Sequence, residues 1–357
     1  MSSLGPDTTA AAGPPSVPPA AAQVRVTRAR RSTLAAAAAV VLIVAVLAYL
    51  PYLVYSGTTN LLVNFFTLLI MASMWNLLAG YAGLVSVGQQ AFVGLGAYGV
   101  LLLASHGTSP FLAIPVATAA CAVLGLPVWW LVSRLRSGYF AITMWVIASV
   151  CELIISQIPS FGGGTGTGLP GLPGNPTLLT ADTYWATLAC AVLALGVVYL
   201  LLRSRIGLVL TAVRDDETGA RSVGVRVAST QRLVFLVAAA GCGVAGALYI
   251  VSQQFVEPTA AFSVLWSAKM IFITVIGGIG TIEGPIIGTI IYFVLQQTLA
   301  QYGTWYFIAL GLVAMAIAIW ARRGIWGLIA DRFGIRLFGV GYWLSPAGPP
   351  DRDRGSR

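Results

Sequence analysis

The sequence is dominated by long apolar runs that alternate with short polar segments. The run over residues 34–54, for example, carries no charged side chain. A helix needs about 20 apolar residues to cross the hydrocarbon core of a bilayer. Because lipid offers the backbone no hydrogen bonds, such runs form helices, whose amides and carbonyls pair within the segment. The pattern therefore predicts an all-α fold, a polytopic bundle of transmembrane helices.

The composition excludes a water-soluble globule. Of the 357 residues, 58% are hydrophobic and only 9% are charged. A soluble domain carries about a quarter of charged residues, so this chain has too few polar side chains to cover a surface in water.

The apolar runs predict about ten spans. We place them at residues 34–54, 61–79, 91–106, 111–132, 139–158, 185–203, 232–252, 264–280, 286–301 and 305–321. Residues 1–33 are expected to be a disordered cytoplasmic tail, residues 34–330 the transmembrane domain, and residues 331–357 a cytoplasmic interfacial segment and tail. The pair Arg30-Arg31 could open an export signal, but the first run is too long for a signal core and many spans follow it.

The basic residues give an orientation. With the N-terminus inside, 19 of the 20 Lys and Arg residues fall on the cytoplasmic side, and Lys269 falls inside the eighth span. Positive charge marks cytoplasmic loops, so we expect both termini in the cytoplasm. The net charge of +9 is spread over these loops. A nucleic-acid-binding protein needs one continuous basic face, so the charge does not favour that function.

Glycine-rich segments predict close helix packing and breaks. Small residues recur every four positions, which lets helix backbones approach in a membrane. A turn or packing role is expected for Gly277, Gly278, Gly280, Gly284, Pro285 and Gly288, and a packing stripe for Ala238, Cys242 and Gly246. The Gly-rich stretch Tyr81 to Gln90 is predicted to be re-entrant or unwound, and its loose likeness to residues 277–288 hints at an internal repeat.

Polar side chains inside the spans are candidates for lining a path through the bundle. A charge at the bilayer centre costs about 2.5–3.5 kcal/mol or more unless it is paired or hydrated. The candidates are Asn76, Gln89, Gln90, Glu152 and Lys269. The competing interpretation is a structural salt bridge or hydrogen bonds between helices.

Signatures of catalysis and metal binding are missing. A P-loop needs the lysine of GxxxxGK[ST], but the sole lysine, Lys269, lies in the context Trp-Ser-Ala-Lys-Met, and the run Gly162 to Gly174 has none. The single histidine, His106, and four scattered cysteines make no metal site. We therefore expect no enzyme activity and no bound metal.

The loop over residues 204–231 is the largest cytoplasmic connection. It mixes three acidic side chains, Asp215, Asp216 and Glu217, with arginines and an apolar side. This amphipathic character favours a short helix that docks into a cytoplasmic partner, and a plain linker is the alternative.

Four motifs resemble the permeases of branched-chain amino-acid ABC transporters. They are NLLAGYAGLVSVGQQAFVGLGAY at residues 76–98, residues 138–171 with GYFAI and GGGTGTGLPG, the stretch from residue 204 through residue 224 with AVRDDETGARSVGV at residues 212–225, and GGIGTIEGPIIG at residues 277–288. The resemblance is collinear over about residues 35–330. It implies a multi-pass protein of the bacterial plasma (inner) membrane that imports branched-chain amino acids.

The resemblance also implies the partners. These are a second, homologous permease in a heterodimer, two cytoplasmic ATPase subunits that use ATP, and an extracytoplasmic solute-binding protein, with no cofactor held by this chain. The coupling segment would be about residues 211–227, with Arg214, Asp215, Asp216, Glu217, Ala220, Arg221 and Gly224. The EAA-x-x-x-G pattern of many importers is here Thr218, Gly219, Ala220 and then Gly224, and Gly219 weakens a helix by about 1 kcal/mol.

Other functions remain open on the sequence alone. A urea or short-amide permease has the same architecture. A gradient-driven secondary transporter would use Glu152 and Lys269 as an ion relay, and a structural membrane subunit would have no path at all.

Overall fold

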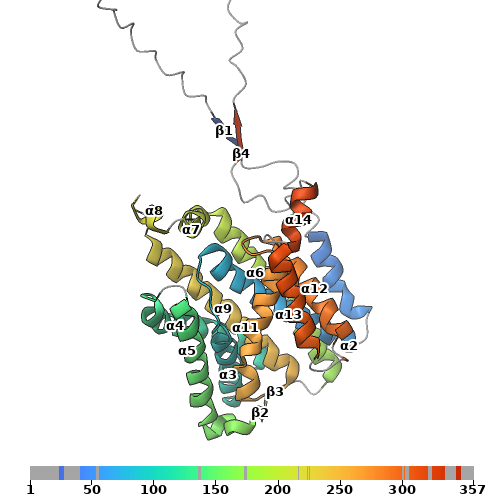
Figure 1. Ribbon diagram of the computed structural model, residues 1–357. Helices are drawn as coiled ribbons and strands as arrows, with labels where there is room; N and C mark the ends of the chain where they lie inside the picture. Colours follow the sequence, from blue (N-terminus) through green and yellow to red (C-terminus); the bar gives the residue numbers. More distant parts are fainter. Residues whose placement is uncertain are drawn as a thin grey trace, which may run out of the picture.

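The computed structural model describes residues 24–27, 41–53, 56–135, 138–172, 175–215, 217–222, 224, 226–299, 301, 305–320, 324–333 and 343–346. Nearly all of them are helical (Figure 1). The helices and short turns are η1 (Leu50–Tyr52), α2 (Ser56–Asn76), η2 (Leu77–Tyr81), α3 (Gln90–Ser105), α4 (Pro110–Val132), α5 (Gly138–Ser156), η3 (Pro159–Phe161), η4 (Gly163–Thr165), α6 (Pro176–Arg203), α7 (Arg205–Asp215), α8 (Glu217–Ser222), α9 (Val227–Gln253), α10 (Pro258–Ala261), α11 (Val264–Gly277), α12 (Glu283–Leu299), α13 (Trp305–Trp320) and α14 (Gly324–Phe333).

Helices occur at every predicted span, with a few shifted ends. In the first span, residues 41–49 are helical, and residues 34–40 lie outside the described part. The largest shift is in α6, which begins at Pro176 rather than at residue 185. Proline suits the first position of a helix because the amide it lacks would be unpaired there. Around the Gly-rich turn, α11 ends at Gly277 and α12 begins at Glu283, each three residues from its predicted end.

Six helices of the described residues are long and apolar enough to cross a membrane. They span residues 57–81, 110–132, 138–156, 178–203, 227–253 and 258–277. Shorter apolar helices occupy residues 41–52, 90–105 and 308–317. The structure thus shows an all-α membrane bundle, and the count of ten spans and the cytoplasmic side of the termini stay predictions.

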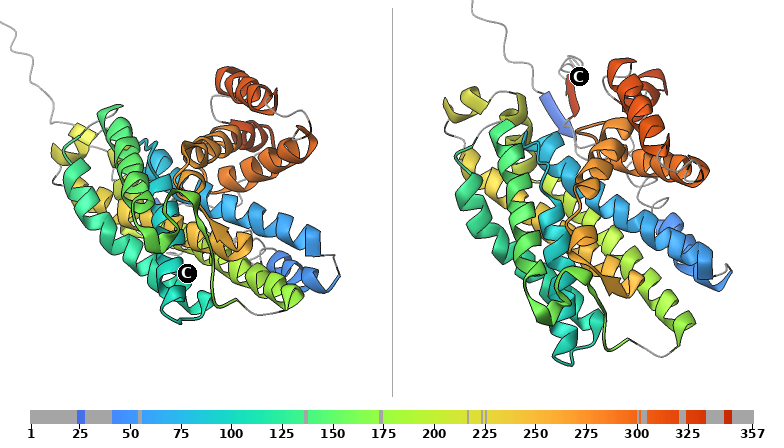
Figure 2. Two further views of the ribbon diagram at one scale, coloured as in Figure 1. Left: turned by 90° about the horizontal axis from the view of Figure 1, so that it is seen from below. Right: turned by 60° about the horizontal axis from the view of Figure 1, so that its bottom comes forward.

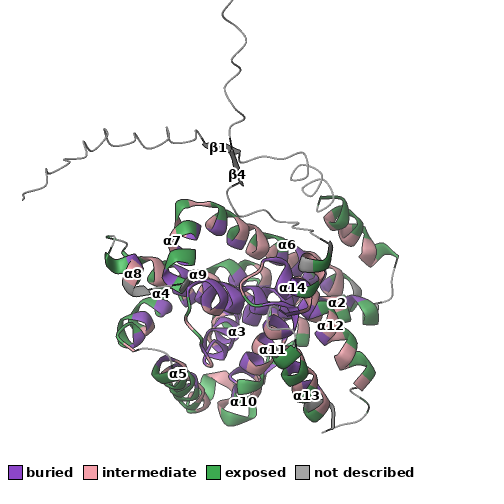
Figure 3. Cartoon of the chain, turned by 45° about the horizontal axis from the view of Figure 1, so that its top comes forward, coloured by how far each residue is buried: buried purple, intermediate pink, exposed green. Residues whose placement is uncertain are grey.

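The bundle has a buried centre and an exposed rim (Figure 3). In α2, 78% of the most apolar stretch is buried, against 17% in α5. The rim exposes large apolar side chains such as Trp130, Tyr139 and Trp145. Such a surface suits lipid and not water. The C-terminal helices α12, α13 and α14 gather on the side away from α4 and α5 (Figure 2).

Glycine brings α3 and α9 into direct backbone contact. A Cβ added to Gly96 would collide with the carbonyl of Gly243, and one added to Gly246 would collide with the carbonyl of Val93. Ala238 and Cys242, of the predicted stripe, are fully buried on α9. Small residues therefore set the spacing of the two central helices.

The two ends of the bundle differ. α7, α8, α14 and a two-stranded sheet of β1 (Val24–Thr27) and β4 (Trp343–Pro346) lie at one end, hereafter the α7/α8 end (Figure 1). In that sheet Val24 pairs with Pro346 and Thr27 with Trp343, antiparallel. At the opposite end β2 (Thr167–Gly168) pairs with β3 (Phe255–Val256). Most of both predicted tails lies outside the described residues, so the predicted division of the chain stays a prediction.

Candidate functional site

The connection from α2 to α3 is broken near the α7/α8 end. α2 passes into the π-helix η2, and residues 83–88 run without regular structure. The segment is held by Trp75, whose Nε1 donates to the Ser86 carbonyl at 2.8 Å. Ser86, Gln89 and Gln90 are fully buried. Irregular backbone at membrane depth is tolerated only inside protein, so the structure confirms the predicted unwound segment.

Asn76, at the last position of α2, clamps the Gly-rich turn between α11 and α12. Its Nδ2 donates to the Thr281 carbonyl at 2.8 Å, and its Oδ1 accepts from the Gly280 amide at 2.8 Å. Gly280 has φ +77°, which glycine adopts without strain. Asn76 thus makes hydrogen bonds between helices, and it lines neither of the two cavities described below.

The other small residues of the predicted turn pack backbone against backbone. A Cβ on Gly277 would collide with the Gly284 carbonyl, and a Cβ on Gly288 with the Ile273 carbonyl. Gly278 lies against Gly324 at the start of α14, and Pro285 is buried in the first turn of α12. The turn therefore joins α11, α12 and α14 with little room between them.

Arg214 connects α7 to η2 and to the Gly-rich turn. Its Nη1 donates to the Gly80 carbonyl of η2 at 3.2 Å. The same nitrogen occupies the space that a Cβ on Gly280 would need. Next to it, Gln231 of α9 donates to the Ala82 carbonyl at 3.4 Å. We refer to Asn76, Gly80, Arg214, Gly280 and Thr281 as the junction.

α7 and α8 replace the predicted short helix of the coupling loop. Val209, Val213 and Ala220 pack with Val227 of α9 in a small apolar cluster. Gly224 follows α8 and ends it, because its φ is +82° and its amide donates a hydrogen bond to the Arg221 carbonyl. Asp216 and the side chains of Asp215 and Glu217 lie outside the described residues.

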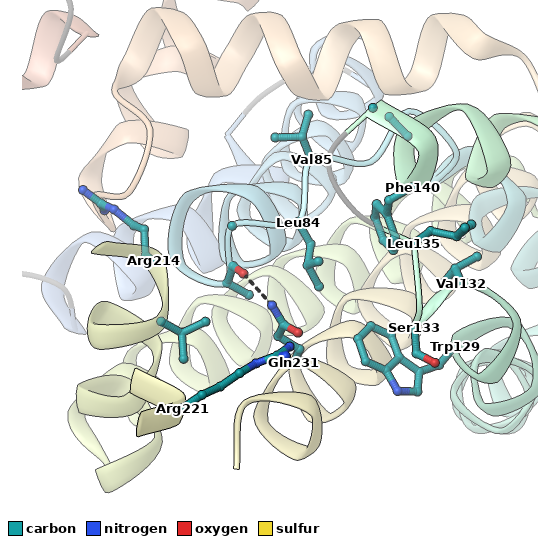
Figure 4. Close-up of a pocket in the computed structure, with 15 residues that line it drawn as sticks. Leu84, Val85, Trp129, Val132, Ser133, Leu135, Phe140, Arg214, Arg221 and Gln231 are labelled. Atoms are coloured by element: carbon teal, nitrogen blue, oxygen red, sulfur yellow. Dashed lines mark hydrogen bonds between the residues drawn. The ribbon is translucent and has the colours of Figure 1, made fainter. Parts of the chain in front are cut away.

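A cavity of about 590 Å³ opens at the α7/α8 end (Figure 4). Arg214, Arg221 and Gln231 line one side, and Trp129 and Phe140 line the other. The irregular segment, at Leu84 and Val85, lies between them. The cavity therefore lies between α7, α8 and the broken connection.

Gln89 and Gln90 are fully buried at the start of α3. Gln90 accepts a hydrogen bond through Oε1 from the Ser267 hydroxyl of α11. Within the described part of the chain, neither amide atom of Gln89, nor Gln90 Nε2, nor the Ser73 hydroxyl has a hydrogen-bond partner. A buried polar group without a partner costs about 1–3 kcal/mol, so each of these groups calls for an explanation.

A second cavity, of about 490 Å³, lies at the opposite end between α2, α9, α11 and α12. Lys269 lines it, with its ammonium 4.3 Å from the ring centroid of Trp266. Glu152 lines neither cavity and is half-buried on the peripheral helix α5.

Sequence reasoning missed Ser267 and Gln231, which contact the predicted residues from other helices. In the sequence, only their position could have drawn attention to them, since each is a polar residue at or near the end of an apolar run.

Comparison with known proteins identifies the fold's family. A family model described as branched-chain amino acid transport system / permease component matches residues 57–323. The chain belongs to this family. No solved structure matches the permease.

Two bacterial relatives are similar over most of the permease. It is 28% identical over 303 residues to the "High-affinity branched-chain amino acid transport system permease protein LivM" of Escherichia coli. The protein of that name from Salmonella typhimurium is 27% identical, and each alignment covers 77% of this chain and 71% of the relative. The "Probable branched-chain amino acid transport permease protein LivH" of Methanocaldococcus jannaschii is 22% identical, over 60% of this chain and 71% of the relative.

Family and fold together fix the class of protein. The permease is a multi-pass protein of the inner membrane, and it is the membrane component of an ATP-binding-cassette transport system and not itself an enzyme.

Proposed function

We propose that the permease moves branched-chain amino acids into the cytoplasm, driven by ATPase subunits that bind α7 and α8. It binds no cofactor itself, and ATP is used by the partners. The solute is inferred from the relatives, whose names specify branched-chain amino acid transport.

The contact of Arg214 with Gly80 carries the proposal. It joins a helix of the predicted cytoplasmic loop directly to the break in a central helix. Through Asn76 the break is bonded to the turn between α11 and α12. A displacement of α7 by a partner would therefore reach α2, α11 and α12 through a short series of contacts.

Two further features support the same mechanism. The cavity beside Arg221 gives a solute an exit at the α7/α8 end. Gln89 and Gln90 give it hydrogen-bonding groups inside the bundle, since their amides include buried atoms without a partner among the described residues. On this proposal, the acidic residues Asp215, Asp216 and Glu217 face the ATPase, together with Ala220 and Gly224.

The full assembly is expected to contain a second permease, two ATPases and an extracytoplasmic binding protein. The test is reconstitution of this assembly in liposomes, with uptake of labelled leucine, isoleucine and valine measured with and without ATP, and urea as the competing solute. Uptake of the amino acids that requires ATP supports the proposal. Uptake without ATP that an uncoupler abolishes, or uptake of urea alone, would refute it.

Arg214→Ala tests the coupling step in the same liposomes. Arg205→Ala is the matched control, because Arg205 is an exposed arginine at the first position of the same helix. Loss of a hydrogen bond from a charged donor costs about 1.5–3 kcal/mol. We therefore expect uptake per ATP hydrolysed to fall at least tenfold in Arg214→Ala and to stay near wild type in Arg205→Ala. Equal coupling in both variants would contradict the route through Gly80.

A further inference from the structure

The cavity at the end opposite α7 and α8 holds a cation with no carboxylate beside it. Lys269 is the sole lysine of the chain. It is half-buried, and the residues that line the cavity include no Asp or Glu. Among the described residues, Lys269 forms no ion pair. A buried charge is normally paired or hydrated because desolvation penalises it strongly.

The rest of the lining is uncharged, and it combines polar with apolar side chains. Amides and hydroxyls come from α2, α9 and α12, at Asn64, Thr67, Ser252, Gln253 and Gln296. Gln296 Oε1 is buried and has no hydrogen-bond partner in the described part of the chain. The cavity therefore offers a cationic donor and a free acceptor oxygen in one space. A lipid-facing surface would show neither.

These groups match the two charges of an amino acid. An ammonium such as that of Lys269 binds a carboxylate, and an amide oxygen such as Gln296 Oε1 accepts from an α-ammonium. Trp266, whose ring lies under Lys269, holds the side chain in place through a cation–π contact.

We propose that this cavity is a binding site for the zwitterionic head of an α-amino acid, with Lys269 receiving the carboxylate and Gln296 the ammonium. The proposal rests on the proposed function and specifies its substrate class. A carboxylate requirement excludes urea and simple amides, because they lack the group that Lys269 binds. The site lies at the predicted outer end, where a solute arrives.

The test is protection of the cavity against a neutral thiol reagent. Ser252→Cys places a near-isosteric thiol in the lining, and its alkylation rate by iodoacetamide is followed by mass spectrometry of the peptide. The measurement uses the full chain, with the subunits that purify with it, in phosphatidylcholine nanodiscs without ATP. The probes are leucine, leucinamide, which lacks the carboxylate, and 4-methylpentanoate, which lacks the ammonium.

We expect leucine to slow the alkylation at least fivefold, 4-methylpentanoate to protect only at higher concentration, and leucinamide not to protect. In the same background, Lys269→Met should raise the leucine concentration for half-protection about 10- to 100-fold, and Lys269→Arg should raise it less. Thr298→Val is the control, because Thr298 is exposed on α12 outside the cavity lining and its hydroxyl donates to Val294 of its own helix at 2.9 Å; it should leave protection unchanged.

Several results would overturn the assignment. These are a thiol that does not react at all, equal protection by leucinamide, and protection that survives Lys269→Met. Nanodiscs that contain phosphatidylglycerol separate a lipid phosphate from the solute. If that lipid alone protects as well as leucine does, the cavity binds lipid. Since no transport is involved, leucine protection in an assembly that imports no amino acid would refute the proposed function and leave this site standing.

Discussion

Replacement of Asn76 by alanine tests whether the junction holds the bundle together. Asn76 is 1% exposed and makes two hydrogen bonds to the Gly-rich turn. Hydrogen bonds between helices in membrane proteins contribute about 0.6 kcal/mol on average and about 1.7 at most. Removal of the side chain also leaves the Gly280 amide and the Thr281 carbonyl without partners, at about 1–3 kcal/mol each. We expect Asn76→Ala to lower the free energy of unfolding by about 2–4 kcal/mol.

Unfolding by SDS in mixed micelles, followed by tryptophan fluorescence, measures this change. Asn76→Asp keeps the acceptor for Gly280 but places a buried carboxylate oxygen against the Thr281 carbonyl, so it should be at least as destabilising as Asn76→Ala. Asn60→Ala is the matched control, since Asn60 is exposed on the same helix, and it should stay within about 0.5 kcal/mol of wild type. If Asn76→Ala is as stable as Asn60→Ala, the clamp does not stabilise the fold and the reasoning fails.

Three further substitutions probe the same core. Gly280→Ala strains a positive φ and displaces the Arg214 side chain, which occupies the Cβ position. We expect uptake to fall and the free energy of unfolding to drop by about 1–3 kcal/mol. The control is Gly311→Ala, which has open space around it and should lower neither quantity. Gln89→Leu removes two buried polar atoms without partners, so the protein should be at least as stable in SDS while uptake falls at least tenfold; unchanged uptake would place Gln89 outside the path. Gly246→Ala forces α9 away from the Val93 carbonyl of α3 and should lower the free energy of unfolding by about 1–3 kcal/mol in the SDS titration. Gly196→Ala lies at a helical position with open space around it and should raise that free energy by about 0.5–1 kcal/mol.

The positions of the helices could be predicted because the length of an apolar run is set by the bilayer. The start of α6 could not, since the polar residues Thr177, Thr180 and Asp182 read as a loop. In the structure they belong to the helix, which begins at Pro176. At 28 residues and about 1.5 Å per residue, α6 is longer than the hydrocarbon core is thick. Its first turns therefore have room for polar side chains outside the lipid.

The site was predictable residue by residue but not as an arrangement. Asn76, Gln90 and Arg214 were each identifiable as polar groups in unusual places. Their partners lie far away in the chain, as Ser267 does from Gln90, at a separation of 177 residues. Which face of a helix meets which neighbour depends on helix rotation, and a single sequence with apolar residues on all sides leaves that rotation undetermined.

The glycine contacts between α3 and α9 and between α11 and α12 also constrain how this protein can change shape. Side chains can exchange one packing for another by changing rotamer, but carbonyl oxygens pressed against glycine Cα atoms have no second arrangement. Between α3 and α9, a slide of one helix turn would bring the Cβ of Cys242 or Ile250 onto the carbonyl that Gly246 now faces. We therefore expect α3 and α9 to move as one unit, and alternating exposure of the solute to come from motion of this pair against the neighbouring helices or from the helices at the rim.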